Sequence, residues 1–273
     1  MIAVRNKTAI PAVSIPMTRY LACAALLAFS TPALAQDEND YRVRVGLGAM
    51  VQPVFIGSED FQVRPIVDAD FAKGTNPFGF GSPDDPIGVK LFSKNGFSVG
   101  PAVNLQRKRS VSDLDLPLKK VPTTFEGGGF VQYMAGESFR IRADLRKGFG
   151  GHDGLLGSVG ADYVSRDGDR YVFAIGPRVL FSDSKFQRAY FGVSPADSVT
   201  SGLPQYRPSG GIYALAATSS LSYQLSSRWG IFGYGRYERL VGDAAKSPVI
   251  RDLGSRNQLS GGIGLNYTFI IKR

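Results

Sequence analysis

The chain has 273 residues, of which 33 are glycine, and charged residues make up 20% of it. So much glycine, against a usual share of about 7%, together with this moderate charge content excludes a disordered chain and a helical bundle. It favours a single domain of closed β structure.

Residues 1–35 have the layout of a secretory signal peptide. Basic Arg5, Lys7 and Arg19 precede an apolar run over 21–29, and small residues lead up to Ala35, after which we expect cleavage. We therefore predict a signal peptide at 1–35 and one domain at 36–273.

Two alternatives concern this leader. A start at Met17 instead of Met1 would give a signal of the usual length, and either start leads to export. A lipoprotein anchored at Cys23 is the weaker alternative, because Tyr20-Leu21-Ala22 is a poor lipobox. Cys23 is the single cysteine, so cleavage after Ala35 would leave a mature chain without disulfide or thiol chemistry.

The mature chain keeps a positive surplus. Removing residues 1–35 leaves 29 basic and 23 acidic residues, a net charge of about +6. Export excludes nucleic acid as a partner, so we expect the surplus to meet anionic lipid head groups, lipopolysaccharide or peptidoglycan, or to line a lumen. The mature sequence has no apolar run of about 18 residues, so a membrane could be crossed only by strands.

Period-two alternation recurs along the mature chain. Apolar residues alternate with arginine or glycine in 41–49, with charged residues in 139–146, and with small or polar residues in 155–163, 171–181 and 259–269. Each segment therefore predicts a strand with one apolar and one polar face.

Connection lengths predict the strand count. Short connections lie at 93–96, 135–138, 165–169 and 226–228, and long ones at 53–86, 108–124, 148–154, 182–210 and 241–256. Short and long connections alternate strictly, as in a barrel with short periplasmic turns and long extracellular loops. We predict ten strands, at 41–52, 87–93, 96–107, 125–135, 138–147, 155–164, 170–181, 211–225, 228–240 and 257–269.

Two apolar pieces within the long loops leave an alternative of twelve strands. Counting 61–71 and 188–193 as strands would put several long loops on the periplasmic side. We prefer ten strands, with these pieces as extracellular extensions, strands within loops, or segments folded back into the lumen.

Aromatic residues favour a membrane barrel over a soluble one. They stand near the predicted strand ends, where membrane barrels carry interfacial girdles. The last strand ends in Tyr267-Thr268-Phe269, similar to the terminal aromatic signal of outer-membrane barrels, with Ile270–Arg273 extending beyond it. The predicted fold is an all-β, closed, antiparallel transmembrane barrel in the outer membrane.

Such a narrow barrel is expected to be nearly filled by side chains, which argues against a general porin. We interpret the inward charges as an ion-pair network, with an anion-selective slit as the alternative. The predicted lumen network is Arg42, Arg44, Arg140, Arg142, Asp144, Arg146, Asp162 and Arg178, accompanied by Arg170, Arg236, Glu126 and Glu238.

The sequence gives little support for catalysis. His152, the only histidine, lies in a predicted loop; Asp153 beside it would project elsewhere, and Ser158 lies on the predicted lumen face. One histidine without a mature cysteine also makes a poor metal-ligand set. We therefore expect no enzyme activity, no cofactor and no metal.

Four phrases in order make the chain resemble the MipA/OmpV family of outer-membrane proteins over nearly all of 41–269. They are Gly57-Ser58-Glu59-Asp60, Tyr190-Phe191-Gly192-Val193, Ser201-Gly202-Leu203-Pro204-Gln205-Tyr206 and 242–248. The candidate family positions are Gly57, Ser58, Asp60, Phe191, Gly192, Gly202, Leu203, Pro204, Tyr206, Gly242, Asp243, Ser247 and Pro248.

The resemblance implies a non-enzymatic role. The family's namesake is a scaffold that links a lytic transglycosylase to a bifunctional penicillin-binding synthase, coupling murein hydrolysis to synthesis. Other members resemble adhesins or osmotically regulated surface proteins, so a surface adhesin or antigen and a narrow solute channel stay as alternatives. In the predicted topology the phrases face outward, whereas a murein scaffold needs periplasmic contacts. Either the phrases fold into the lumen or the orientation is inverted.

Overall fold

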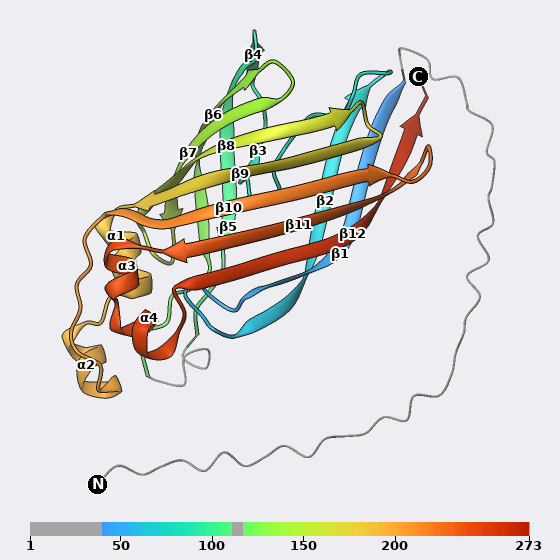
Figure 1. The fold of residues 1–273 in the computed structure, drawn as a ribbon. Coiled ribbons are helices and arrows are strands. Elements are labelled where there is room, and N and C mark those ends of the chain that lie inside the picture. Colours follow the sequence, from blue (N-terminus) through green and yellow to red (C-terminus); the bar gives the residue numbers. More distant parts are fainter. Residues whose placement is uncertain (1–39, 111–116, 273) are drawn as a thin grey trace, which may run out of the picture. The chain divides into compact units, whose positions relative to one another are not determined.

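The computed structural model describes residues 40–110 and 117–272 (Figure 1). The predicted signal peptide at 1–35 lies outside the described residues. Within the described part of the chain, no helix is both long and apolar enough to cross a membrane.

The strands form one antiparallel sheet in the order β2-β1-β12-β11-β10-β9-β8-β7-β6-β5-β3, with β4 paired to β5. Their bounds are β1 Tyr41–Pro53, β2 Phe61–Lys73, β3 Ile87–Gly88, β4 Phe92–Lys94, β5 Phe97–Gln106, β6 Thr124–Ala135, β7 Phe139–Phe149, β8 Leu155–Asp167, β9 Tyr171–Ser182, β10 Gly211–Gln224, β11 Trp229–Leu240 and β12 Asn257–Ile271. The sheet confirms the antiparallel all-β prediction.

The first and last long strands lie side by side. Tyr41 of β1 pairs with Ile271 of β12, and the register continues to Val51 opposite Gly261. Between the described residues, no pairing joins β2 to β3 or β5. A seam without sheet hydrogen bonds therefore separates β2 from β3, and full closure of the barrel stays a prediction.

The preferred count of ten strands is wrong, because β2 is a full strand within the predicted long loop 53–86. Its exposed apolar residues, such as Val63 and Val67, alternate with less exposed polar ones along its length. Pro65, opposite Ala49 of β1, makes the segment look loop-like. An edge strand tolerates proline, because one of its sides needs no N–H donor.

The count of twelve does not come from the two apolar pieces of the alternative prediction. Only 61–71 becomes a strand; most of 188–193 belongs to helix α1 (Ser184–Phe191). The strand predicted at 87–93 is instead interrupted, giving the short β3 and β4. A short apolar run has no periodicity that separates strand from helix, which explains the error at 188–193.

The polarity of the sheet is inverted relative to a soluble protein. Leu47, Val63 and Ile263 are 65%, 73% and 68% exposed on the outer face, whereas Arg140 and Glu126 on the inner face are 1% and 0% exposed. Exposed apolar strands around a polar interior are the pattern of a barrel surrounded by lipid.

Aromatic side chains collect at both ends of the outer face. At the end of the sheet where β1 starts and β12 ends, the Trp229 and Tyr267 rings lie 4.9 Å apart, and those of Phe139 and Tyr163 lie 5.4 Å apart. Exposed rings near the opposite strand ends are Phe61, Phe125, Phe149 and Tyr237. Two such rows are typical of the girdles at the two membrane interfaces.

Short turns and long connections lie at opposite ends of the strands. The turn end holds the start of β1, the end of β12 and the tight connections after β4, β6, β8 and β10. At the other end Figure 1 shows α1, α2 (Pro195–Ser201), α3 (Gly242–Lys246) and α4 (Pro248–Leu253) gathered together. We call the described connections at that end, 54–60, 107–110, 117–123, 150–154, 183–210 and 241–256, the cap.

Candidate functional site

Residues 74–86, the luminal segment, connect β2 to β3 along the inner face of the sheet. The segment begins at the turn end, where the Phe78 N–H donates to Asp169 at 2.8 Å and Arg166 donates to the Phe78 carbonyl at 3.0 Å. Phe78 itself is only 2% exposed. The segment is thus held by the turn between β8 and β9 on the far side of the interior.

Asp84 ties the luminal segment to three neighbouring strands. Its carboxylate accepts from Arg178 of β9 at 3.0 Å, from Thr218 of β10 at 3.0 Å and from Arg236 of β11 at 2.8 Å. The Asp84 side chain is 4% exposed. Buried charges of this kind are stable only when paired and hydrogen-bonded, and here these three partners come from three different strands.

Asp85 extends the ion pairs to β7 and β8. It lies 2.5 Å from Arg140, which also contacts Asp162 at 2.6 Å, and Asp162 in turn lies 2.7 Å from Arg178. The luminal segment therefore supplies two carboxylates to a continuous network of buried charges.

Aromatic side chains of the luminal segment cover further arginines. The guanidinium carbons of Arg42 and Arg44 lie 4.7 Å and 4.4 Å from the centre of the Phe78 ring, and that of Arg140 lies 4.8 Å from Phe80. Cation–π contacts of this length are attractive and strongest where water is excluded. A cavity of about 390 Å³ remains beside the segment, bordered by Arg146, Arg178 and Arg236 among others.

His152 joins the inner face to the cap. Its Nε2 lies 3.2 Å from Glu126, and its Nδ1 accepts from the Gly154 N–H at 3.1 Å. Glu126 also accepts from Asn104 at 2.9 Å and from Arg146. Both ring nitrogens are thus engaged, and the ring is packed edge-on against Phe186, so the contacts of His152 hold the cap to the inner face.

The charged residues predicted for the lumen lie on the inner face with one exception. Arg42, Arg44, Arg140, Arg142, Asp144, Asp162 and Arg178 are buried there, and Arg146 is nearly so. Arg170 instead precedes β9 in an exposed turn, 71% exposed and 3.7 Å from Asp167. It lies outside the strand, so the alternation that we extrapolated to it does not apply.

The four family phrases, far apart in the sequence, come together in the cap. Gly57, Ser58 and Asp60 lie in the β1–β2 connection; Phe191 and Gly192 end α1; Gly202, Leu203, Pro204 and Tyr206 follow α2; Gly242 and Asp243 begin α3; Ser247 and Pro248 begin α4. Their packing has an apolar centre that includes Phe191 and Ile250 and a second cluster with Leu203 and Val249.

Gly57 occupies a position that only glycine fits. Its φ is +92°, and a Cβ there would lie 2.1 Å from Cδ1 of Ile250 in α4. The Gly57 N–H donates to Gln258 at 3.0 Å, and Gln258 donates to the Ser58 carbonyl at 3.0 Å. The first phrase is thereby fixed against α4 and the start of β12.

Ser247 joins two other phrases. Its hydroxyl donates to the Phe191 carbonyl at 2.7 Å and accepts from the Val249 N–H at 3.2 Å, which caps α4. Pro248 follows in the first turn, where proline needs no hydrogen-bond partner.

Tyr206 and Asp243 connect the remaining phrases. The Tyr206 hydroxyl donates to the Asp243 carbonyl at 2.9 Å, and the Asp243 carboxylate accepts from the Ser209 hydroxyl at 2.6 Å and N–H at 2.9 Å. The two hydrogen bonds from Ser209 lower the pKa of Asp243. Three of the family phrases therefore contact one another, and the first packs against α4 and the start of β12, so that all four lie in the cap.

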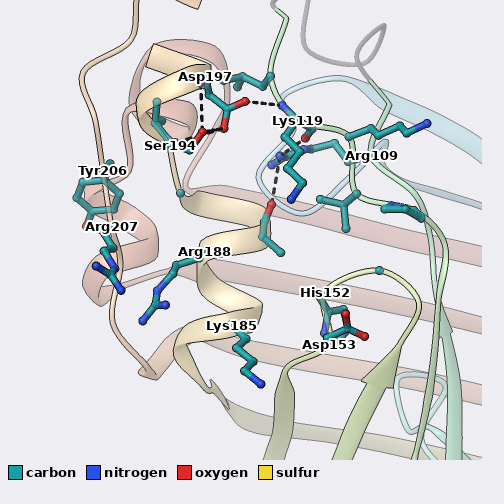
Figure 2. Close-up of a pocket in the computed structure, with 18 of the residues that line it drawn as sticks. Arg109, Lys119, His152, Asp153, Lys185, Arg188, Ser194, Asp197, Tyr206 and Arg207 are labelled. Carbon is teal, nitrogen blue, oxygen red and sulfur yellow. Dashed lines mark hydrogen bonds between the residues drawn. The ribbon is translucent and has the colours of Figure 1, made fainter. Parts of the chain in front are cut away.

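The cap encloses a half-open pocket of about 750 Å³, shown in Figure 2. Its basic lining residues come from the β5–β6 connection, from α1 and from the segment after α2, and outnumber its carboxylates by six to two. They are Arg109, Lys119, Lys120, Lys185, Arg188 and Arg207, and the carboxylates are Asp153 and Asp197.

Sequence reasoning missed both the luminal segment and this cap pocket. For the segment a signal existed: Asp84 and Asp85 lie between two prolines and face an interior that the alternation predicts to be rich in arginine. The pocket residues are scattered over three connections, and the only hint was a positive surplus that the inner face does not use.

Most of the chain matches a known protein family. Residues 45–269 match the family described as "MltA-interacting protein MipA". The chain belongs to the MipA family. This confirms the resemblance that the four phrases suggested, and family membership together with the apolar outer face supports an outer-membrane β-barrel.

No curated protein matches the chain. Among solved structures it is similar to the NanC porin, at 12% identity over 83% of this chain and 98% of that chain with a TM-score of 0.38. It is also similar to the outer-membrane channel DcaP of Acinetobacter baumannii, at 8% identity, 88% and 99% coverage and a TM-score of 0.38. A third is an anion-selective porin from Comamonas acidovorans, at 8% identity, 86% and 100% coverage and a TM-score of 0.37.

Proposed function

We propose that this MipA family member is exported by residues 1–35, resides in the outer membrane and acts there as a scaffold that brings a murein hydrolase to a murein synthase. The observation that carries the proposal is the luminal segment. Its buried ion pairs to β7, β9 and β11 occupy the interior, where a channel would need open space. A barrel whose interior is filled in this way offers surfaces for binding other proteins rather than a path for solutes.

The family description supports a lytic transglycosylase as one partner, and coupling of hydrolysis to synthesis gives a penicillin-binding synthase as the second. With the start of β1 and the end of β12 on the periplasmic side, as in barrels with short periplasmic turns, the turn end faces these enzymes. Its turns carry Lys94, Glu137, Arg170 and Arg228, charges that a transient polar interface could use. The cap then lies at the cell surface, and the scaffold needs no inversion of the barrel.

Co-purification tests the scaffold. We expect the tagged full chain, extracted in mild detergent, to retain a lytic transglycosylase and a bifunctional synthase, detected by murein-digesting and murein-polymerising activity. A variant with Glu137, Arg170 and Arg228 changed to serine should retain less of both. A charge-matched variant in the cap, Glu59→Ser/Lys108→Ser/Arg251→Ser, should retain both fully. Retention of neither enzyme by the unmodified protein contradicts the scaffold.

The narrow channel is the competing function, and planar bilayers separate the two. We expect the unmodified protein to insert without discrete conductance steps, because Asp84 and Asp85 hold the luminal segment in place. Regular conductance steps, with a reversal potential that indicates selectivity for anions, would favour the channel and count against the scaffold.

A further inference from the structure

The cap pocket differs from the rest of the molecule in the balance of its charges. Among the described residues, nine inner-face or turn arginines have carboxylates within 4 Å. In contrast, no ion pair among the described residues involves Lys119, Lys120, Lys185, Arg188 or Arg207. Much of the positive surplus of the mature chain therefore faces this one pocket.

The two pocket carboxylates have other roles. Asp197 accepts from the Lys119 N–H at 3.0 Å and from the Ser194 hydroxyl at 2.6 Å, which fixes the start of α2. Asp153 accepts from the Gly150 N–H at 3.2 Å within its own turn. Both carboxylates thus hold backbone in place, and among the described residues neither forms an ion pair with Lys119, Lys120, Lys185, Arg188 or Arg207.

Arg109 holds the walls of the pocket together. It is 2% exposed, and its guanidinium donates to the carbonyls of Tyr190 at 2.5 Å, Ala189 at 3.2 Å and Lys119 at 3.1 Å. The last turn of α1 and the β5–β6 connection are thereby joined through one buried side chain. This linkage fixes the backbone from which Lys119, Lys185 and Arg188 extend, as Figure 2 shows.

We propose that the cap pocket binds a ligand that carries phosphate groups on a sugar-sized frame, through Lys119, Lys185, Arg188 and Arg207. Lysine and arginine are the side chains that bind phosphate, arginine through a two-pronged contact and lysine as a point charge. A pocket of about 750 Å³ falls within the range of small-molecule sites and exceeds what a single phosphate fills. Four cations from three segments suit more than one anionic group.

Two sources could supply this chemistry at the outward end of a membrane barrel: a soluble sugar phosphate, or the phosphorylated head group of a glycolipid in the surrounding leaflet. The binding site is the same in both cases. The inference concerns the cap alone and holds whether or not the turn end acts as a scaffold.

Calorimetric titration of the full chain in a non-ionic detergent tests the site. The soluble probe is glucose 1,6-bisphosphate, and the lipid probe is lipid A dispersed in the same detergent, each compared with its dephosphorylated form. We expect at least one phosphorylated probe to bind and its dephosphorylated form not to bind. The Lys119→Gln/Lys185→Gln/Arg188→Gln variant should lose roughly 10-fold or more in affinity, the effect of about 1.4 kcal/mol.

The matched control removes equal charge from the cap outside the pocket, in Lys108→Gln/Lys246→Gln/Arg251→Gln. All six side chains are exposed, and circular dichroism checks that each variant is folded. Affinity retained within roughly 2-fold in the control supports the site. Binding of the bisphosphate alone identifies a soluble ligand, and binding of lipid A alone identifies a head group. Equal losses in both variants, or no binding of either phosphorylated probe, overturns the proposal.

Discussion

The inner face of the sheet and the cap both carry many basic side chains, but the two regions balance them differently. On the inner face, Arg140, Arg178 and Arg236 each contact two carboxylates. In the cap, hydrogen bonds to backbone and apolar packing hold the chain together. Among the described residues no ion pair involves five of the pocket cations, Lys119, Lys120, Lys185, Arg188 and Arg207. Paired charge thus fills the interior, while unpaired charge is kept where a ligand can reach it.

The largest expected loss of stability comes from a substitution in the ion-pair network of the inner face. Asp84→Asn removes the charge that neutralises Arg178 and Arg236, and leaving a buried pair without one partner costs about 3–5 kcal/mol. Guanidinium unfolding in detergent measures the loss. The control, Asp167→Asn, removes an exposed partner of Arg170 and should cost less than about 1 kcal/mol. Similar losses in the two variants would contradict the assignment of Asp84 as the centre of the network.

A smaller effect is expected from the cap. Ser247→Ala removes the cap of α4 and the hydrogen bond to the Phe191 carbonyl, at a cost of about 1–2 kcal/mol. Because both hydrogen bonds join the neutral Ser247 hydroxyl to neutral backbone groups, we expect the loss of stability to be insensitive to salt. Hydrogen exchange over 241–256 should rise in the variant. Ser194→Ala, which uncaps the exposed α2, is the comparison and should leave that region protected.

The smallest expected effect comes from protonation of Asp243 in the cap. The charge of this carboxylate is stabilised chiefly by hydrogen bonds, in contrast to the arginine-paired carboxylates of the inner face. Its folded pKa lies below the usual 3.8. The stabilisation is therefore fully present above pH 3.8 and disappears as the pH falls through the folded value. We expect slightly faster proteolysis of the cap in that acidic window. Ser209→Ala should move the Asp243 pKa, read by NMR, back toward 3.8; an unmoved pKa would mean that the Ser209 hydroxyl does not stabilise the carboxylate.

How much the sequence could predict depended on whether a feature is local. Alternation over 139–146 and 259–269 predicted strands because successive side chains of a strand point to opposite faces of the sheet. It failed at β2, where Pro65 and two aspartates resemble a loop, and only the neighbouring β1 shows that the segment is an edge strand. The order of the four phrases indicated the family.

The contacts across the interior could not be predicted in the same way. Asp84 is 94 residues from Arg178 and 152 from Arg236, so nothing local in the sequence links these side chains. The cap pocket has the same difficulty, because Lys119 and Arg188 become neighbours only when Arg109 joins the two segments. The sequence shows that arginines and carboxylates are both present on the predicted inner face. It does not show which arginine pairs with which carboxylate.

The position of β1 in the sheet has a consequence for synthesis of the chain. The neighbours of β1 are β2 and β12, so the first hairpin joins the rest of the sheet only through the last strand. A chain interrupted before Asn257 would therefore lose three strands from the sheet, since β1 and β2 would have only each other to pair with. The order of the sheet can be completed only after β12 has been synthesised, which makes assembly depend on contacts between strands that lie far apart in the sequence.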